Sequence, residues 1–187
     1  MTSNIWKSFP SKVKRILTIL VFFLISIAVT VAGVSTPLTV EEASEMEKEL
    51  GEMRDYISTA GLFRGTTLIF GNNFVLCLAF FVPFFGPIFG FFVLYSTGVV
   101  IAAQSICSGV NPHFAFLMLF LFPFTWLEFL AYSAAFAESV WLSWRIIKGG
   151  WRREIVNMCI MISICAVTLL LAAFIEMALI KAFTPLP

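Results

Sequence analysis

Long apolar runs separated by short polar segments are the dominant pattern along the chain. A helix of about 20 apolar residues crosses the roughly 30 Å hydrocarbon core of a bilayer. Five stretches reach this length, at residues 16–34, 66–83, 88–107, within 113–144, and 155–182. The pattern predicts an all-α fold, a polytopic membrane helix bundle of about five transmembrane helices that forms one integral membrane domain over residues 1–187.

The fourth apolar region is too long for one straight crossing. As a helix, its 32 residues would extend about 48 Å. Pro123 lies inside it, and proline breaks or kinks a helix because it lacks an N–H donor and clashes with the preceding turn. The region is therefore either a half-helix over residues 113–122 followed by a proper span, or one kinked and tilted helix. We favour the half-helix, because a crossing that ends at Arg145 begins near residue 123.

The polar segment between the first two spans, residues 36–64, has an amphipathic pattern of its own. Thr39 followed by Glu42 matches a capping box, which is typical of a helix N-terminus. An apolar stripe then recurs at helical spacing along an acidic helix: Val40, Met46, Leu50, Met53 and Ile57, with Ala43 between the first two. This helix either folds back onto the outer ends of its own bundle or offers the stripe as a docking face to a partner outside the membrane.

Basic residues indicate the orientation of the bundle. One group precedes the first span and another lies between the fourth and fifth spans: Lys7, Lys12, Lys14 and Arg15, then Arg145, Lys148, Arg152 and Arg153. With five spans both groups fall on one side, which the positive-inside rule assigns to the cytoplasm. We therefore expect a multi-pass protein of the cell membrane with a cytoplasmic N-terminus, an extracytoplasmic C-terminus and an extracytoplasmic 36–64 segment.

Composition supports a membrane protein and argues against other classes. The chain is 60% hydrophobic and 12% charged, with a mean hydropathy of +0.97, whereas soluble domains carry about 25% charged residues. Its net charge of +1 gives no reason to expect a nucleic-acid partner. Four cysteines without zinc-ligand spacing and a single histidine, His113, predict no metal site and no cofactor.

Carboxyl groups inside the apolar spans are the strongest functional signal, because each costs about 3 kcal/mol to place there. Glu128 and Glu138 lie in the fourth region and Glu176 in the fifth span, and these stretches contain no Lys or Arg before Lys181 at the end of the fifth. Counting the helical rise places Glu128, Glu176 and the Asn72–Asn73 pair at a similar depth in the outer half. Glu138 falls nearer the inner side.

This predicted polar cluster, which comprises Asn72, Asn73, Glu128, Glu138 and Glu176, has three interpretations. Amide–carboxyl hydrogen bonds could clamp spans two, four and five together. A wet cavity could bind or pass a cation, a proton or a small polar solute. The residues could also lie at an interface between subunits.

Small residues form a second pattern. Gly86 and Gly90 are four residues apart, Gly98 continues the small face in the same span, and Ala131 and Ala135 have the same spacing in the fourth region. Small residues at this spacing let helices approach closely. The pattern predicts tight packing between spans three and four, with helix–helix dimerisation as the alternative.

Several of these elements, taken in order, resemble the stage II sporulation protein M family. They are Asn72-Asn73, the three glycines Gly86, Gly90 and Gly98, the run PFTWLEFLA at 123–131, and AAFIE at 172–176 before Pro185. The likeness covers residues 62–187. Phe124-Thr125 stands where the family usually has His-Gly, and Thr97 where it usually has Asn. The resemblance implies an integral membrane protein without catalysis that organises partner proteins, and it does not imply sporulation, since members occur in organisms that never sporulate.

Two functions follow as expectations. The first is a non-enzymatic membrane scaffold or subunit that assembles with itself, as a homo-oligomer, and with other membrane or extracytoplasmic proteins. The alternative is a small-solute or ion channel or transporter that uses the intramembrane Glu and Asn residues. No phosphate-binding glycine loop, nucleophile elbow or zinc-binding helix is present in the sequence, so we expect no enzymatic activity.

Overall fold

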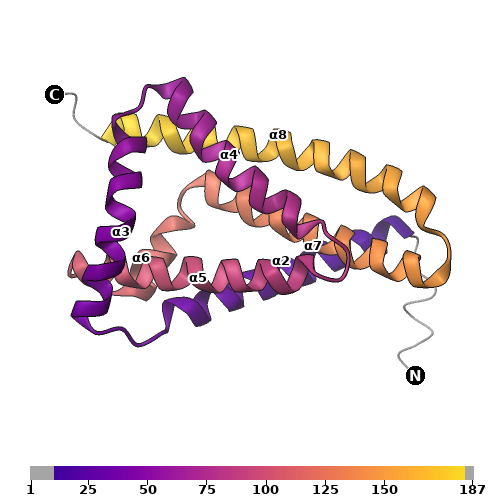
Figure 1. The fold of residues 1–187 in the computed structure, drawn as a ribbon, viewed down its shortest axis with the longest axis horizontal. Coiled ribbons are helices and arrows are strands. Elements are labelled where there is room, and N and C mark those ends of the chain that lie inside the picture. Colours follow the sequence, from indigo (N-terminus) through magenta and orange to yellow (C-terminus); the bar gives the residue numbers. More distant parts are fainter. Residues whose placement is uncertain (1–10, 184–187) are drawn as a thin grey trace.

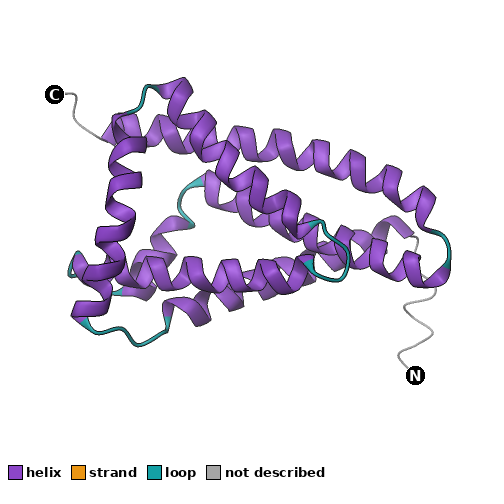
Figure 2. Ribbon diagram, in the orientation of Figure 1, coloured by secondary structure: helices purple, strands orange, loops and turns teal. Residues whose placement is uncertain are grey.

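The computed structural model describes residues 11–183, which form helices joined by short turns (Figure 1, Figure 2). Seven helices follow one another in this range: α2 Ser11–Val34, α3 Val40–Thr59, α4 Leu62–Phe80, α5 Gly86–Cys107, α6 Pro112–Leu119, α7 Pro123–Lys148 and α8 Trp151–Phe183. The all-α bundle predicted from the sequence is confirmed. Lys7 and Pro185, named above, lie outside the described residues.

Four of these helices, α2, α4, α5 and α8, are long and apolar enough to cross a membrane, and the α6–α7 pair makes a fifth if it counts as one span. The predicted number of spans therefore holds. Four predicted starts, those of α2, α4, α5 and α8, were too late by two to five residues. The largest difference is in α2, which begins at Ser11 rather than at residue 16 and so includes Arg15 in its first turns.

The fourth region is two helices, as the half-helix interpretation predicted. α6 and α7 meet at an angle of 86°, and Pro123 is the first residue of α7, where its missing N–H costs nothing. Side chains of α7 satisfy carbonyls at the end of α6. Thr125 donates to Leu119 O (2.8 Å), and the Trp126 indole donates to Phe120 O (2.8 Å).

α7 is the central helix of the bundle. α2 and α5 lie side by side on one edge, α4 and α8 pack together on the other, and α7 contacts all four (Figure 1). Residues 131–139 of α7 are all buried, since alanines and serines let neighbours approach from every side. Gly149, with φ 79°, then ends α7 and lets the chain return as α8.

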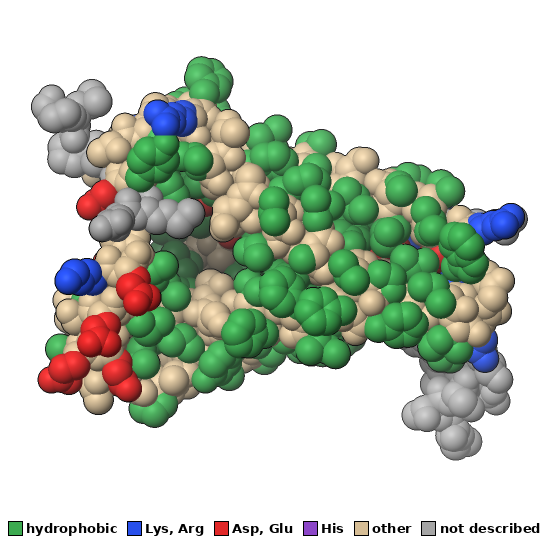
Figure 3. Space-filling view, in the orientation of Figure 1, with side chains coloured by type: hydrophobic (Ala, Val, Ile, Leu, Met, Phe, Trp, Pro, Cys, Tyr) green, Lys and Arg blue, Asp and Glu red, His purple; other side chains and the backbone are tan. Residues whose placement is uncertain are grey.

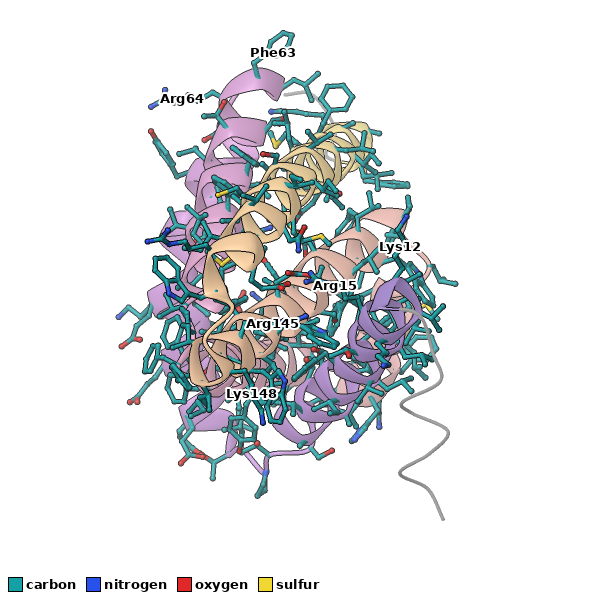
Figure 4. The ribbon with its side chains drawn as sticks, turned by 90° about the vertical axis from the view of Figure 1, so that its right-hand side faces the viewer. Lys12, Arg15, Phe63, Arg64, Arg145 and Lys148 are labelled. Atoms are coloured by element: carbon teal, nitrogen blue, oxygen red, sulfur yellow. The ribbon has the colours of Figure 1, made fainter. Side chains whose placement is uncertain are left out.

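The two ends of the bundle differ in character. The first turn of α2 and the α7–α8 turn lie together at one end, here called the basic end, where Lys12, Arg15, Arg145 and Lys148 gather (Figure 4). α3 lies across the opposite end, here called the α3 end (Figure 1). Acidic side chains gather on the outer surface at this α3 end (Figure 3).

α3 folds back onto its own bundle. Thr39 and Glu42 form the predicted capping box, Ala43 is fully buried, and Ile57 packs against Ile69 and Met177. Of the predicted docking stripe, Val40 is exposed and Met46, Leu50 and Ile57 are half-buried, whereas the Met53 side chain lies outside what the structure describes. The stripe therefore covers the chain's own helices more than it faces outward, because Ala43 and Ile57 need apolar partners.

The small residues pack more widely than predicted. A Cβ on Gly90 would meet the Phe136 ring of α7, and one on Gly86 would lie 3.0 Å from Ser139 Oγ of the same helix, in agreement with close packing of spans three and four. A Cβ on Gly98 would instead meet the backbone of Thr30 in α2. The prediction was wrong for Gly98, because α5 crosses α2 at this level.

The alanines of α7 also differ from the prediction. Ala131 and Ala135 are both buried, and the Cys165 thiol of α8 lies 3.5 Å from Ala131 O. The small side chain of Ala131 thus lets α7 approach α8 and not α5 alone. The reason is that α7 is surrounded, so its small residues serve several neighbours.

Candidate functional site

A cavity of about 260 Å³ lies among α2, α4, α5, α6 and α7, in the half of the bundle nearer α3. The surface is hollowed beside α3 in this region (Figure 3). Each of these helices except α6 contributes polar side chains to the wall: Thr30, Asn72, Asn73, Thr97, Thr125, Glu128 and Tyr132. Aromatic rings complete the lining: Phe116, Phe124 and Phe129. Both helices of the broken fourth region therefore border the cavity.

The cavity wall contains the predicted contact between amide and carboxyl groups. Asn73 Nδ2 of α4 donates to Glu128 Oε1 of α7 at 2.6 Å, and Asn72 Nδ2 lies 3.4 Å from Asn73 Oδ1. The structure thus joins three of the five predicted residues across two helices. This cross-helix bond satisfies part of the hydrogen-bonding capacity of a carboxyl group at span depth.

Glu176 lies next to this group without lining the cavity. It is half-buried on α8 and close enough for its charge to act on Glu128. Its neighbour Met177 is fully buried against Gly65 of α4. Glu176 therefore lies within electrostatic reach of Glu128, and Glu128 is the residue that faces the cavity.

The helical repeat of α7 connects the cavity to an aromatic plug. Glu128, Tyr132 and Phe136 are four residues apart and so share one face. The Phe136 ring packs on rings from three other helices, with centroid distances of 5.0 Å to Phe80, 5.3 Å to Phe91 and 6.0 Å to Phe22. These four phenylalanines, here called the aromatic plug, close the cavity toward the basic end.

Glu138 does not belong to the cavity, which corrects the prediction. It is fully buried beyond the plug, where Arg15 Nη1 donates to its Oε1 at 2.5 Å and its Oε2 at 2.7 Å. The sequence interpretation found no basic partner because it began the first span after Arg15. The earlier start of α2 brings this guanidinium, 21% exposed, to the carboxylate and over the Trp141 ring.

Arg15 also binds a second carboxylate, that of Glu154 in α8. Arg145 Nε lies 3.5 Å from the other oxygen of Glu154. Figure 4, which looks onto the basic end, shows Arg15 and Arg145 lying centrally among the helices, whereas Lys12 lies toward the edge. The basic-end cluster is defined here as Arg15, Arg145, Glu138 and Glu154. Its two guanidinium groups balance two carboxylates and join α2, α7 and α8.

Sequence reasoning missed Arg15 and Glu154 as interacting residues. A signal was available, because they are opposite charges near the same predicted membrane boundary, at the starts of spans one and five. A charged residue at the start of a span is usually assumed to face water. That assumption is why the ion pair between Arg15 and Glu154 was not predicted.

Within the described residues, candidate metal-ligating side chains do not gather at the cavity. Among residues 11–183 with described side chains, no group of three or more His, Cys, Asp and Glu lies close enough to hold a metal ion. The chemistry that the lining does offer is hydrogen bonding, carboxylate charge and aromatic faces.

Comparisons of the chain with protein-family models, with curated proteins and with solved structures find no match. The resemblance to the stage II sporulation protein M family stays a prediction from the sequence. Arguments about function therefore depend on the geometry of the chain itself.

Proposed function

We propose that this chain is a membrane transporter or channel for a small polar solute, with the cavity as its solute-binding site. The observation that carries the proposal is a polar cavity between apolar helices, with Glu128 held by Asn73 in its wall. A carboxyl group at such depth is costly unless it pairs, faces water or serves a ligand. The cavity supplies the space for water or for a ligand.

The broken fourth region supports the same function. Transporters commonly build their solute sites from discontinuous helices near the middle of the membrane. Non-helical backbone is tolerated at that depth where it lines a cavity or is buried in protein. Here α6 and α7 meet at 86°, and Phe116 and Leu119 before the break and Phe124 and Thr125 after it all line the cavity.

The closed end of the cavity also fits a transporter. The aromatic plug and then the basic-end cluster follow the cavity along α7, so packed side chains lie between the cavity and the basic end. Access from one side at a time is what alternating access requires. By the positive-inside rule the basic end is cytoplasmic and the cavity belongs to the extracytoplasmic half of a cell-membrane protein.

Thiol labelling tests whether the cavity is wet and open toward the α3 end. The experiment uses a variant in which the four native cysteines are replaced by Ala or Ser and Thr97→Cys supplies the only thiol. The variant is reconstituted in vesicles with the α3 end facing outward. A membrane-impermeant thiol reagent should label residue 97, because a thiol needs water to form its reactive thiolate. The matched control is Val167→Cys on α8, whose side chain is 69% exposed on the apolar outer surface and should stay unlabelled. Failure to label residue 97 would contradict the proposal.

The scaffold function is the second candidate, and one observation favours it. The outward surface of α3 is acidic, with Glu41, Glu42, Glu45 and Glu49 all exposed. If partners bind this chain, the acidic face is more available to them than the half-buried stripe. Deletion of residues 41–57 should then abolish recovery of partner proteins while Thr97→Cys labelling persists. Unchanged recovery would argue against docking through α3.

A further inference from the structure

The hydrogen-bonding character of the cavity wall points to the class of solute. We infer that the cavity binds a small organic ammonium cation that carries N–H donors. This inference rests on the proposed function of the cavity as a solute site. It is carried by the directions of the hydrogen bonds around the cavity, by the charge of its lining and by its aromatic faces.

The threonine hydroxyls of the wall have already used their protons. Each of the three donates to a backbone carbonyl of its own or a neighbouring helix: Thr30 to Ser26 O at 3.0 Å, Thr97 to Val93 O at 2.9 Å and Thr125 to Leu119 O at 2.8 Å. A hydroxyl has one proton and two acceptor lone pairs. These three groups therefore offer the cavity acceptor sites and no donor.

The amide and carboxyl groups shift the wall further toward acceptors. Asn73 donates one amide N–H to Glu128 Oε1, and Asn72 directs one amide N–H toward Asn73 Oδ1. Glu128 Oε2 and Asn72 Oδ1 accept no hydrogen bond from the described side chains and remain as acceptors. The donors left to the wall are the second amide hydrogens of the two asparagines and the Tyr132 hydroxyl. A solute rich in donors complements this wall, whereas an anion would meet lone pairs.

Charge favours the same class of solute. Among the described residues that line the cavity there is no Lys or Arg, so the Glu128 carboxylate has no cationic partner in the wall. The Glu176 carboxyl lies close enough to interact electrostatically with Glu128, and a bound cation favours the ionised form of both groups. A buried carboxylate without a partner is strongly unfavourable, and a bound cation supplies that partner.

The rings of the wall suit an organic cation in particular. Phe116, Phe124, Phe129 and Tyr132 border the cavity, and the faces of aromatic rings attract cations while also packing against alkyl groups. Its volume of about 260 Å³ is below the roughly 300–1,000 Å³ of pockets for drug-sized ligands. The solute is therefore an amine with a few heavy atoms.

Calorimetric titration of the purified full chain in lipid nanodiscs tests this inference with propylammonium, the neutral alcohol 1-butanol and the anion butyrate. Propylammonium should bind saturably and at least tenfold more tightly than butanol, and butyrate should show no binding. Equal or tighter binding of butanol, or any saturable binding of butyrate, would overturn the inference.

Variants locate the binding in the cavity. Glu128→Gln keeps the volume and a hydrogen bond to Asn73 but removes the charge, so propylammonium affinity should fall at least tenfold. Glu45→Gln makes the same change on the exposed face of α3 and should leave affinity unchanged. Thr97→Val, which removes one acceptor at constant shape, should weaken binding several-fold and serves if Glu128→Gln does not fold. Unchanged affinity in the folded cavity variants would contradict the inference.

The two proposals fail differently. If residue 97 is labelled by the impermeant thiol reagent while butanol binds as well as propylammonium, the solute class is wrong and the transporter proposal stands. If residue 97 is not labelled, the cavity is not an accessible solute site and both proposals fall.

Discussion

Single charged residues decide how this bundle tolerates its buried carboxylates. Arg15 holds Glu138 with two hydrogen bonds and pairs with Glu154 as well. Among the described residues, Glu128 has the Asn73 amide as its hydrogen-bond partner, and it faces the cavity. The same side-chain type is therefore paired with a guanidinium group at the basic end and lines a cavity in the α3 half.

Replacing Arg15 by glutamine should destabilise the protein by about 3–5 kcal/mol, because Glu138 is left as a buried charge without its partner. Denaturant unfolding in detergent micelles measures the change. Lys12→Gln removes the same charge from an exposed position at the same end and should change stability by less than about 0.5 kcal/mol. Similar unfolding of the two variants would show that the ion pair contributes little.

The capping box of α3 should give its first turn a dependence on pH. The backbone N–H of Thr39 and then its hydroxyl donate to the Glu42 carboxylate and lower its pKa below the ordinary 4.5. Because the folded pKa is the lower one, the stabilisation is complete above pH 4.5 and is lost as pH falls through the lowered folded value. NMR chemical shifts of residues 39–43 in micelles should report fraying there, and Glu42→Gln should remove this dependence.

At the scale of elements, small residues determine how closely the helices approach. α7 is surrounded because residues 131–139 include four alanines and two serines, and α5 approaches α2 where Gly98 faces Gly33. These contacts are between helix backbones, which cannot adjust as a flexible side chain would.

Gly98→Ala should therefore destabilise the protein by about 1–3 kcal/mol, the usual cost of overpacking, because the new Cβ meets the Thr30 carbonyl. Gly71→Ala is the matched control, since a Cβ at that position in α4 meets nothing within 4 Å. It should leave the protein equally stable or up to about 1 kcal/mol more stable, as expected for Gly to Ala in a helix. Thermal unfolding of both variants in one detergent compares them, and equal loss in both would contradict the packing argument.

At the scale of the whole molecule, two polar layers are separated by the aromatic plug. The cavity lies on the α3 side and the basic-end cluster on the other, with Phe136 between them on the same helix. The separation explains why Glu128 and Glu138, ten residues apart on α7, have different partners. Under the proposed function, the aromatic plug is the barrier between the cavity and the basic end.

Phe136→Ala should open this barrier and raise the leak of methylammonium across proteoliposomes severalfold over the unaltered chain. Phe92→Ala removes the same ring from a side chain that is 68% exposed on α5 and should leave the leak unchanged. Size-exclusion chromatography confirms that both variants remain folded. A folded Phe136→Ala protein without added leak would show that the plug is not the barrier.

Local signals in the sequence were sufficient for the helices and for some of their boundaries, although four helix starts were predicted too late. Length and hydropathy predicted the spans, Pro123 predicted the break before α7, and Thr39 with Glu42 predicted the start of α3. Helical rise also predicted the shared depth of Asn73 and Glu128, because depth along a helix depends only on residue count. These properties depend on neighbours along the chain.

The tertiary structure alone decided which face of each helix meets which neighbour. In a soluble protein, hydrophobic periodicity marks the buried face of a helix. Here the lipid and the bundle core are both apolar, so the periodicity gives almost no information about how each helix is rotated about its axis. Thus Gly98 meets α2, and Arg15 reaches Glu138 from 123 residues away. The sequence by itself determined what lies at each depth, and packing decided which of those groups touch, because contact requires rotation and lateral position as well as depth.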